Sequence, residues 1–248
     1  AHGKTAELSA TLTSDGLWEG EDYVRIAAAS KTMGCPSPFW FTGYSLGGQL
    51  ALWAIKAGQT VNEWGKDLQL DESEIAGGAV ICPSVDSKRS LTYLEQDPLG
   101  KYLEKAIAKE LKKLASKIHQ YHPKDIDPEA LERANSIWAF DRELTIPRLG
   151  FSTVEEYYDA SSPLYLLPNL KKPTLILYAI DDPMFDPTLV EDLQRICATN
   201  RAIDLRLTTY GGHVGYLSRK NCQNQWGDGD RWWAWNRILD WVNNKHLT

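Results

Sequence analysis

The sequence predicts an α/β fold in which helices cover both faces of a mostly parallel sheet. Short continuous apolar runs alternate with helical segments along most of the chain, and such runs are typical of parallel strands that are buried on both faces. One pentapeptide also has the form of a sharp turn between a strand and a helix. The chain has 248 residues, of which 43% are hydrophobic and 24% charged, so one domain of this class can bury a sizeable core.

The elements of this fold follow one another in chain order. Four apolar runs predict strands, at residues 39–42, 75–82, 174–180 and 203–209. The last run alternates apolar and polar residues, as a strand nearer the edge of a sheet does. Three segments, one before, one between and one after the strands, predict helices at residues 19–32, 48–57 and 230–242.

The segment over residues 86–147 breaks this alternation. We therefore expect a core made of residues 1–85 and 148–248, with a helical lid inserted between its two parts. Apolar residues in the insert recur at a spacing of three to four, which predicts an amphipathic helix: Leu103, Ile107, Leu111, Leu114 and Ile118. Such a helix either offers an apolar wall to a substrate or packs its stripe on its own domain, and both interpretations stay open.

Charge and cysteine content exclude several classes of protein. The net charge is −6 and the pI is near 5.4, which gives no reason to expect nucleic acid as a partner. No apolar run approaches the ~20 residues of a membrane span. The four cysteines are far apart and form no C-x-x-C pair: Cys35, Cys82, Cys197 and Cys222. We expect mostly buried, reduced thiols in the cytoplasm, and neither a metal nor a cofactor.

The turn pentapeptide is Gly43-Tyr44-Ser45-Leu46-Gly47, which has the form G-x-S-x-G. An aromatic run precedes it and good helix formers follow it, as a nucleophile elbow requires. A strand that turns this sharply into a helix exposes the serine hydroxyl at a strained apex. We expect glycine at both sides because nothing larger fits so tight a turn. Ser45 is therefore the candidate nucleophile.

A serine nucleophile needs a base, and His213 is the strongest candidate. It follows the strand expected at residues 203–209 and has glycines on both sides. In an open parallel sheet, functional sites lie outside the carboxyl ends of the strands. The other histidines are weaker candidates, because they lie near the ends of the chain or in the helical insert: His2, His119, His122 and His246.

The base in turn needs a carboxylate that orients it. Asp182 is favoured because it follows the strand at residues 174–180 and because Pro183 would fix its turn. Neighbouring Asp181 is expected to be solvated or to cap the next helix. Asp86 is a further candidate for the orienting acid. Asp186 is instead expected to cap a helix at residues 187–196.

These pieces together resemble the YheT-like branch of the α/β-hydrolase family. The matching pieces are residues 43–48, 151–158, 161–163, 181–183 and 211–215, and the resemblance covers most of residues 39–217, more weakly in the helical insert. It implies that Ser45 is the nucleophile, Asp182 the acid and His213 the base. It also implies an esterase or lipase-like activity on carboxylic esters, lipid and medium-chain esters among them.

The start of the chain departs from that family. Its members have several strands ahead of the elbow, and an early His-Gly loop supplies part of the oxyanion hole. Only 44 residues precede Ser45, so these strands are expected to be missing. His2-Gly3 matches either that loop or a later glycine-rich one. The amide of Leu46 is then the one oxyanion donor identified. The start of the sequence inside a longer protein, completion of the sheet by another chain, and a degenerate domain would each explain the departure.

Taken together, the residues predict a serine hydrolase that cleaves a small-molecule ester or lipid through an acyl-enzyme. Two alternatives use the same fold. One is a non-catalytic or partner-completed binding protein, and the other is an acyltransferase that uses Ser45 but passes the acyl group to an acceptor other than water.

Overall fold

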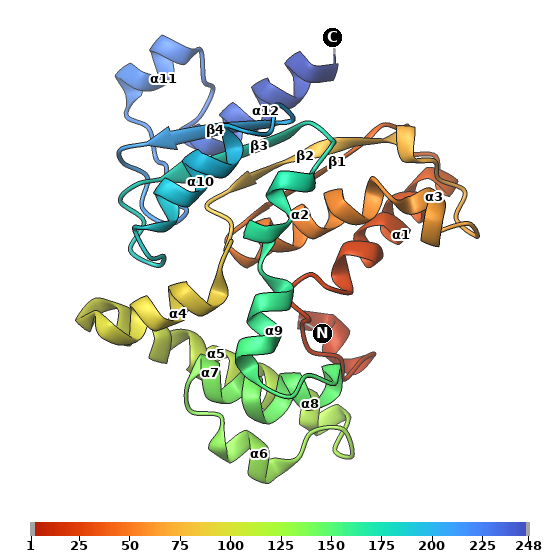
Figure 1. The fold of residues 1–248 in the computed structure, drawn as a ribbon, viewed down its shortest axis with the longest axis vertical. Helices are drawn as coiled ribbons and strands as arrows, with labels where there is room; N and C mark the ends of the chain where they lie inside the picture. The colour runs from red at the N-terminus through yellow and green to blue at the C-terminus, as the bar shows by residue number, and fades with distance from the viewer. Residues whose placement is uncertain (1–2, 247–248) are drawn as a thin grey trace. The chain divides into compact units, whose positions relative to one another are not determined.

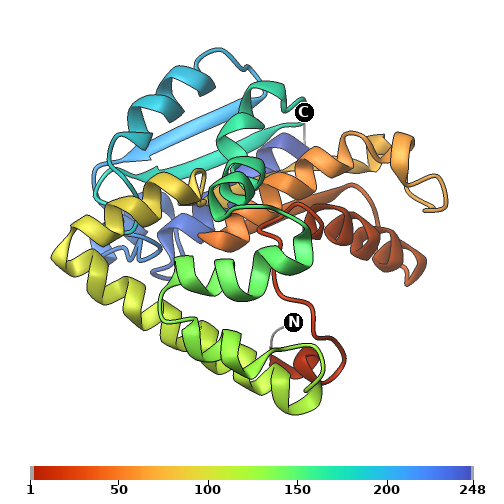
Figure 2. The same ribbon diagram turned by 60° about the horizontal axis from the view of Figure 1, so that its bottom comes forward.

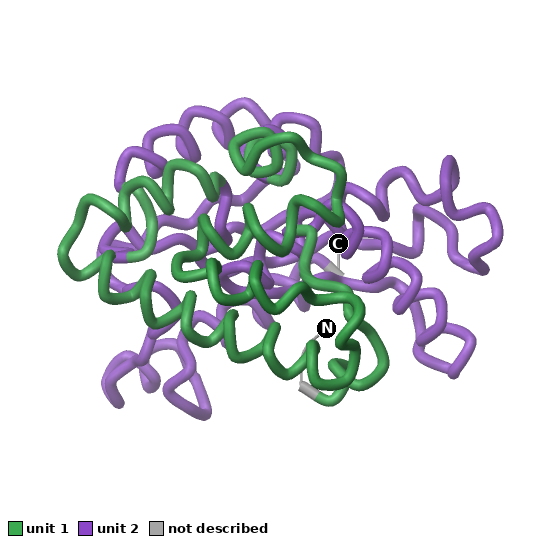
Figure 3. The backbone as a smooth tube through the Cα atoms, turned by 90° about the horizontal axis from the view of Figure 1, so that it is seen from below, with its two compact units in different colours: residues 1–14, 86–161, 184–186 green, residues 15–85, 162–183, 187–248 purple. Residues whose placement is uncertain are grey.

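The computed structural model describes residues 3–246, and the chain forms two compact units (Figure 3). Unit 1 consists of Ala1–Ser14, Asp86–Ser161 and Met184–Asp186. Unit 2 consists of Asp15–Val85, Ser162–Pro183 and Pro187–Thr248. The segments of both units alternate along the sequence, so each unit is assembled from stretches that are far apart in the chain.

A four-stranded parallel sheet forms the centre of unit 2 (Figure 1). Its strands follow in the order of the chain: β1 (Phe39–Tyr44), β2 (Ile75–Ile81), β3 (Thr174–Ala179) and β4 (Ile203–Thr208). All of β3 is buried, whereas β4 alternates and has no second neighbour among the described strands. The four strands expected from the sequence, and the position of the last one at an edge, are confirmed.

Helices cover both faces of this sheet, as the sequence predicts. Adjacent strand residues point to opposite faces, and the ring of Trp40 contacts Trp241 while the ring of Phe41 contacts Tyr23. The helix that carries Tyr23 and the helix that carries Trp241 therefore lie on opposite faces (Figures 1 and 2). The main helices of unit 2 are α1 (Glu19–Thr32), α2 (Leu46–Gly58), α10 (Leu189–Cys197) and α12 (Trp233–His246).

Shorter helical elements complete unit 2. They are α3 (Val61–Trp64), η2 (Glu72–Glu74), η4 (Pro163–Tyr165), η5 (Leu167–Asn169) and α11 (Lys220–Trp226). The expected final helix begins three residues later than predicted, at Trp233, because residues 228–231 form a turn-rich segment in which Asp230 accepts a hydrogen bond from the amide of Trp232. Helix α1 has the predicted bounds.

The elements of unit 1 that the structure describes are all helical. They are η1 (Gly3–Glu7), α4 (Ser87–Gln96), α5 (Pro98–Tyr121), α6 (Pro128–Arg133), α7 (Ile137–Phe140), a π-helical segment (Asp141–Thr145), α8 (Ile146–Leu149) and α9 (Val154–Ser161). Asp97 caps α5 by accepting a hydrogen bond from the amide of Gly100, and Pro98 is its first residue, a position where the missing N–H of proline costs nothing.

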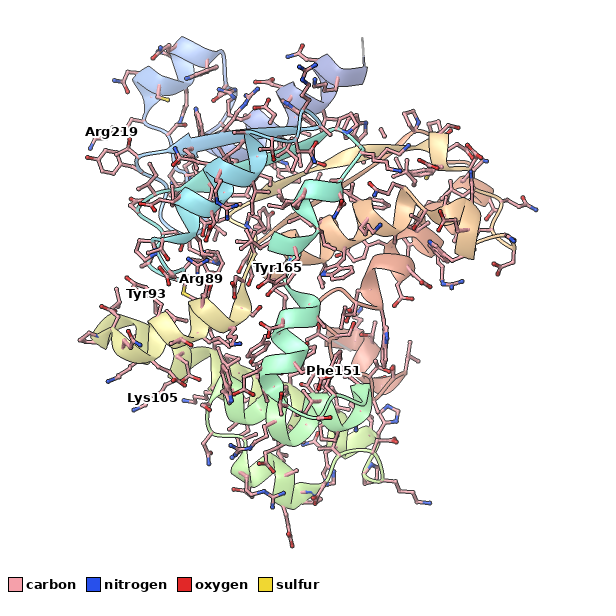
Figure 4. The ribbon with its side chains drawn as sticks, in the orientation of Figure 1. Arg89, Tyr93, Lys105, Phe151, Tyr165 and Arg219 are labelled. Atoms are coloured by element: carbon pink, nitrogen blue, oxygen red, sulfur yellow. The ribbon has the colours of Figure 1, made fainter. Side chains whose placement is uncertain are left out.

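The predicted amphipathic helix is α5, and its apolar stripe packs inside unit 1. Ile118 is fully buried in the core of this unit, and Leu111 and Leu114 pack against that core. The lysines of α5 lie mostly on its exposed side, Lys105 among them (Figure 4). Unit 1 therefore has an apolar core of its own, and the role of this segment as a lid stays a prediction.

Two further expectations concern the state of the cysteines and the presence of a membrane-spanning helix. All four cysteines are free thiols, of which Cys82 and Cys197 are buried, Cys222 is partly exposed and Cys35 is exposed. None of the helices described above has the length and apolar composition that crossing a membrane needs.

Candidate active site

The turn at Ser45 has the geometry of a nucleophile elbow. Strand β1 ends at Tyr44 and helix α2 begins at Leu46, so Ser45 is the single residue between them. Its φ and ψ are 53° and −128°, a conformation that costs a non-glycine residue about 1–3 kcal/mol. The amide of Ser45 donates to the carbonyl of Ile81 at 3.1 Å, and its carbonyl accepts from the amide of Gly48 at 2.9 Å. Bonds on both sides thus hold the strained residue in place.

Steric space explains only part of the glycine pattern around the elbow. A Cβ on Gly43 would lie 2.1 Å from the carbonyl oxygen of Gly47, so the first glycine is required. A Cβ on Gly47 would meet nothing within 4 Å, whereas one on Gly48 would lie 3.0 Å from the Cβ of Pro83. The prediction that both glycines of the pentapeptide are needed for space is therefore correct for Gly43 and wrong for Gly47.

The imidazole of His213 joins Ser45 to Asp182. Its Nε2 lies 2.7 Å from the hydroxyl oxygen of Ser45, and its Nδ1 lies 2.9 Å from Oδ2 of Asp182. A carboxylate only accepts, so Nδ1 carries the proton and Nε2 is left to accept the hydroxyl proton. The Asp182 side chain is 2% exposed and that of His213 is 19% exposed. His213 can therefore accept the proton of Ser45, and solvent reaches the imidazole but hardly reaches the Asp182 carboxylate.

Three loops bring these side chains together at one edge of the sheet. Ser45 follows β1, Asp182 lies three residues after the end of β3, and His213 lies five residues after the end of β4. Because parallel strands all end at the same edge, residues that are distant in sequence meet there. The sequence predicted each of the three positions.

The loop that carries His213 is anchored by its neighbours. Gly212 has a φ of +57°, and a Cβ on Gly211 would lie 2.6 Å from the ring of Tyr216. The amide of Gly212 donates to Oδ1 of Asp181 at 2.8 Å. Asp181 was expected to be solvated or to cap a helix. Its side chain is exposed, but its carboxylate binds the loop backbone, and no sequence pattern pointed to that contact.

The buried thiol of Cys82 and the phenol of Tyr216 contact each other beside this loop. The sequence analysis did not predict this contact. The Cys82 sulfur lies 3.4 Å from the hydroxyl of Tyr216, and Thr208 donates to that hydroxyl at 3.4 Å. Burial raises the pKa of the Cys82 thiol to about 12 and raises the pKa of Tyr216 as well. Both groups are therefore neutral at physiological pH and support the loop by packing and hydrogen bonding.

The alternative carboxylates lie in unit 1 and have other partners. Asp86 caps α4 by accepting a hydrogen bond from the amide of Arg89 at 3.0 Å. The side chain of Arg89 (Figure 4) lies 3.9 Å from Asp186. Helix α10 begins at Leu189 with Thr188 at its N-cap position, so the prediction that Asp186 caps this helix is wrong.

Two of the alternative histidines hold the backbone of unit 1. Nδ1 of His119 lies 2.9 Å from the carbonyl of Ile126, and Nε2 of His122 lies 3.1 Å from the carbonyl of Ala6. His2 and the side chain of His246 lie outside the described residues. Among the histidine side chains that the structure describes, His213 is thus the one that contacts a serine hydroxyl and a carboxylate together.

An apolar cavity of about 360 Å³ adjoins the elbow and the His213 loop. Tyr44 precedes Ser45 and Val214 follows His213 in the chain, so the cavity is lined by sequence neighbours of the reacting residues and not by Ser45, Asp182 or His213 themselves. Aromatic and aliphatic groups supply most of its wall, which is typical of small-molecule sites. Its lining consists of Tyr44, Ile81, Val214, Gly215, Tyr216, Trp232, Ala234 and Trp235.

Comparison with known proteins shows what the chain is similar to. It is 54% identical over 251 aligned residues to “Putative esterase slr0264” of Synechocystis sp., covering 100% of this chain and 68% of that protein. It is 26% identical to “Putative esterase YheT” of Escherichia coli over 83% of this chain and 55% of that protein. It is 34% identical to human “Phospholipase ABHD3” over 38% of this chain and 22% of that protein.

No family model matches the chain. The chain spans about two thirds of the length of slr0264 and a smaller share of the other two relatives. The alignment with slr0264 covers all of this chain, and so includes the elbow, the parallel sheet and the loops that carry Asp182 and His213. The chain therefore belongs to the α/β-hydrolase family, together with the relatives slr0264 and YheT.

Proposed function

We propose that this protein hydrolyses carboxylic esters through an acyl-enzyme formed on Ser45, with His213 as general base and Asp182 as the orienting acid. One observation carries the proposal: the His213 imidazole lies between the Ser45 hydroxyl, at 2.7 Å, and the Asp182 carboxylate, at 2.9 Å. Both distances allow proton transfer without rearrangement. The esterase names of slr0264 and YheT support the same reaction.

The reaction has two halves. His213 takes the proton of Ser45 as its oxygen attacks the ester carbonyl, and the resulting imidazolium then protonates the departing alcohol. A water molecule, deprotonated by His213, attacks the acyl-enzyme, and the proton returns to Ser45 as the carboxylic acid leaves. Asp182 holds the tautomer that exposes Nε2 to Ser45, and it stabilises the imidazolium in each half.

The start of helix α2 favours the negative charge that develops on the substrate oxygen. Leu46 is the first residue of α2, directly after the nucleophile. Amides in the first turn of a helix have no partner within the helix, and they lie at the positive end of its dipole. The amide of Leu46 is thus our proposed oxyanion donor, and one such donor contributes about 10²–10³ in rate.

The cavity lined by Tyr44 and Val214 supports a proposal for the substrate class. Its wall is mainly apolar and its volume is about 360 Å³, so it suits a hydrocarbon group rather than a charged one. One relative is named a phospholipase. We therefore propose small lipid or medium-chain esters as substrates, with the apolar part of the ester in this cavity.

A fluorophosphonate probe tests the proposal directly. The wild-type protein should be labelled at Ser45, as located by peptide mass spectrometry, and should turn over a p-nitrophenyl ester of medium chain length. Ser45→Ala should lose both the label and the turnover. Equal turnover by the wild type and Ser45→Ala, or an unlabelled Ser45 in folded protein, would reject the proposal.

A further inference from the structure

We propose that Asp181 is a positioning residue that holds His213 in reach of Ser45 through the backbone of Gly212. The inference rests on the proposed function, because it gives Asp181 a part in the same reaction. Its carboxylate accepts a hydrogen bond of 2.8 Å from the Gly212 amide, one residue before the base. Asp181 itself does not touch the imidazole in this arrangement and acts through the chain that carries it.

Two consecutive acids bind two consecutive residues of the facing loop. Strands β3 and β4 are paired up to Ala179 and Thr208, and their last backbone bond runs from Ile180 to Thr208 at 2.8 Å. Beyond it, side chains join the two loops. Asp181 binds Gly212 and Asp182 binds His213, both across 31 positions of the sequence. The second acid therefore fixes the imidazole, and the first fixes the backbone that bears it.

The shape of the loop directs the Gly212 amide toward Asp181. The carbonyl of Gly211 accepts from the amides of Gly215 and Tyr216, both at 3.2 Å, which closes a tight turn around His213. Gly212 has a φ of +57°, and a Cβ there would meet nothing within 4 Å. Backbone conformation, rather than space, thus accounts for glycine at position 212. An ionised acceptor makes the bond to this amide stronger than a neutral one would.

The distance at stake is small. Nε2 of His213 lies 2.7 Å from the Ser45 hydroxyl, and a displacement of about 1 Å can cost about 10² in rate. Asp181 is exposed, so its loss removes little packing. A change of its side chain should therefore act on catalysis far more than on the stability of the protein.

Three variants separate positioning from charge. Asp181→Ala removes the acceptor and the charge, whereas Asp181→Asn removes the charge but keeps an oxygen that can accept from Gly212. Asp67→Ala is the matched control, since Asp67 is an exposed carboxylate on another turn of unit 2. We expect Asp181→Ala to lower kcat by about 10–100-fold with KM changed by less than about 3-fold. Asp181→Asn should retain kcat within about 5-fold, and Asp67→Ala should match the wild type.

Hydrogen exchange of the Gly212 amide, followed by NMR, gives a readout that needs no activity. Exchange should be at least about 10-fold faster in Asp181→Ala than in the wild type and should be largely restored in Asp181→Asn. Unchanged kcat in Asp181→Ala, or unchanged exchange at Gly212, would overturn the inference. If the wild type lacks ester turnover, the proposed function fails, and the exchange measurement still decides whether Asp181 holds this loop.

Discussion

Nε2 of His213 lies 2.7 Å from the hydroxyl oxygen of Ser45, although the two residues are 168 positions apart in the sequence. The contact depends on loops at the ends of β1 and β4, which lie at the two sides of the sheet. The His213 loop must therefore extend back across the ends of β3 and β2 to reach the elbow. Asp182, after β3, binds the imidazole on this path.

Replacement of Asp182 by Asn should inactivate the enzyme without unfolding it. An Asn at this site can donate to Nδ1 and so stabilise the tautomer that carries a proton on Nε2, which cannot accept the Ser45 proton. We expect kcat to fall by about 10⁴-fold, as tautomer inversion does in other triads. Steady-state ester hydrolysis measures the loss, and far-UV circular dichroism checks the fold. Activity within 10-fold of the wild type, a threshold of about 1.4 kcal/mol, would contradict the role of Asp182.

The two glycines of the elbow pentapeptide should respond differently to alanine. Gly43→Ala places a Cβ 2.1 Å from the carbonyl of Gly47, whereas Gly47→Ala finds open space. Gly43→Ala should therefore lower the free energy of unfolding by more than about 2 kcal/mol. Gly47→Ala lies in the first turn of α2 and should change it by less than about 1 kcal/mol. Urea denaturation of both variants gives the comparison, and equal losses would contradict it.

The stability of the protein should depend on pH through Asp141. Burial raises the pKa of this carboxyl to about 6, although the Tyr158 hydroxyl opposes the shift by donating to it at 2.5 Å. A carboxyl whose pKa is raised in the folded state contributes stability that is fully present below its unfolded pKa near 4 and is lost as the pH rises through 6. Between pH 4 and pH 8 the free energy of unfolding of the wild type should therefore fall by about 2–3 kcal/mol relative to that of Asp141→Asn.

Urea unfolding at several pH values measures this difference for Asp141. Asp159→Asn is the control, because it makes the same change of charge at an exposed carboxylate of unit 1. The control should follow the wild type at every pH. A constant difference between Asp141→Asn and the wild type from pH 4 to pH 8 would show that Asp141 does not titrate in this range.

The thiols should differ in reactivity toward iodoacetamide. Burial raises the pKa of Cys82 to about 12 and that of Cys197 to about 11, whereas Cys35 is exposed. The reagent attacks thiolates, so at pH 8 the folded protein should be alkylated at Cys35 and spared at Cys82 and Cys197. Peptide mass spectrometry before and after unfolding in urea gives the fraction of each cysteine that is alkylated in the folded and in the unfolded protein. Modification of Cys82 as fast as Cys35 in folded protein would contradict its burial.

Local sequence determined the elements and the identity of the reacting side chains. Apolar runs predicted β1 to β4, helix-forming residues predicted α1 and α2, and the glycine-flanked positions after strands pointed to Ser45 and His213. These features depend on neighbours within a few residues, through backbone conformation and hydrophobic period. The pattern favoured Asp182 over Asp181 as the acid because of Pro183, but it did not show that Asp181 binds the Gly212 amide, since that contact depends on the direction of the Asp181 side chain.

Tertiary structure alone decided the contacts across the sheet. It directed Asp182 to the imidazole and Asp181 to the Gly212 amide, and it placed the Tyr216 hydroxyl beside the Cys82 thiol. It also showed that an added side chain would be too close to its neighbours at Gly43 and at Gly48, but not at Gly47. Each of these depends on how segments far apart in the chain pack against one another. The sequence by itself therefore determined which groups are available for chemistry, and packing decided which of them meet.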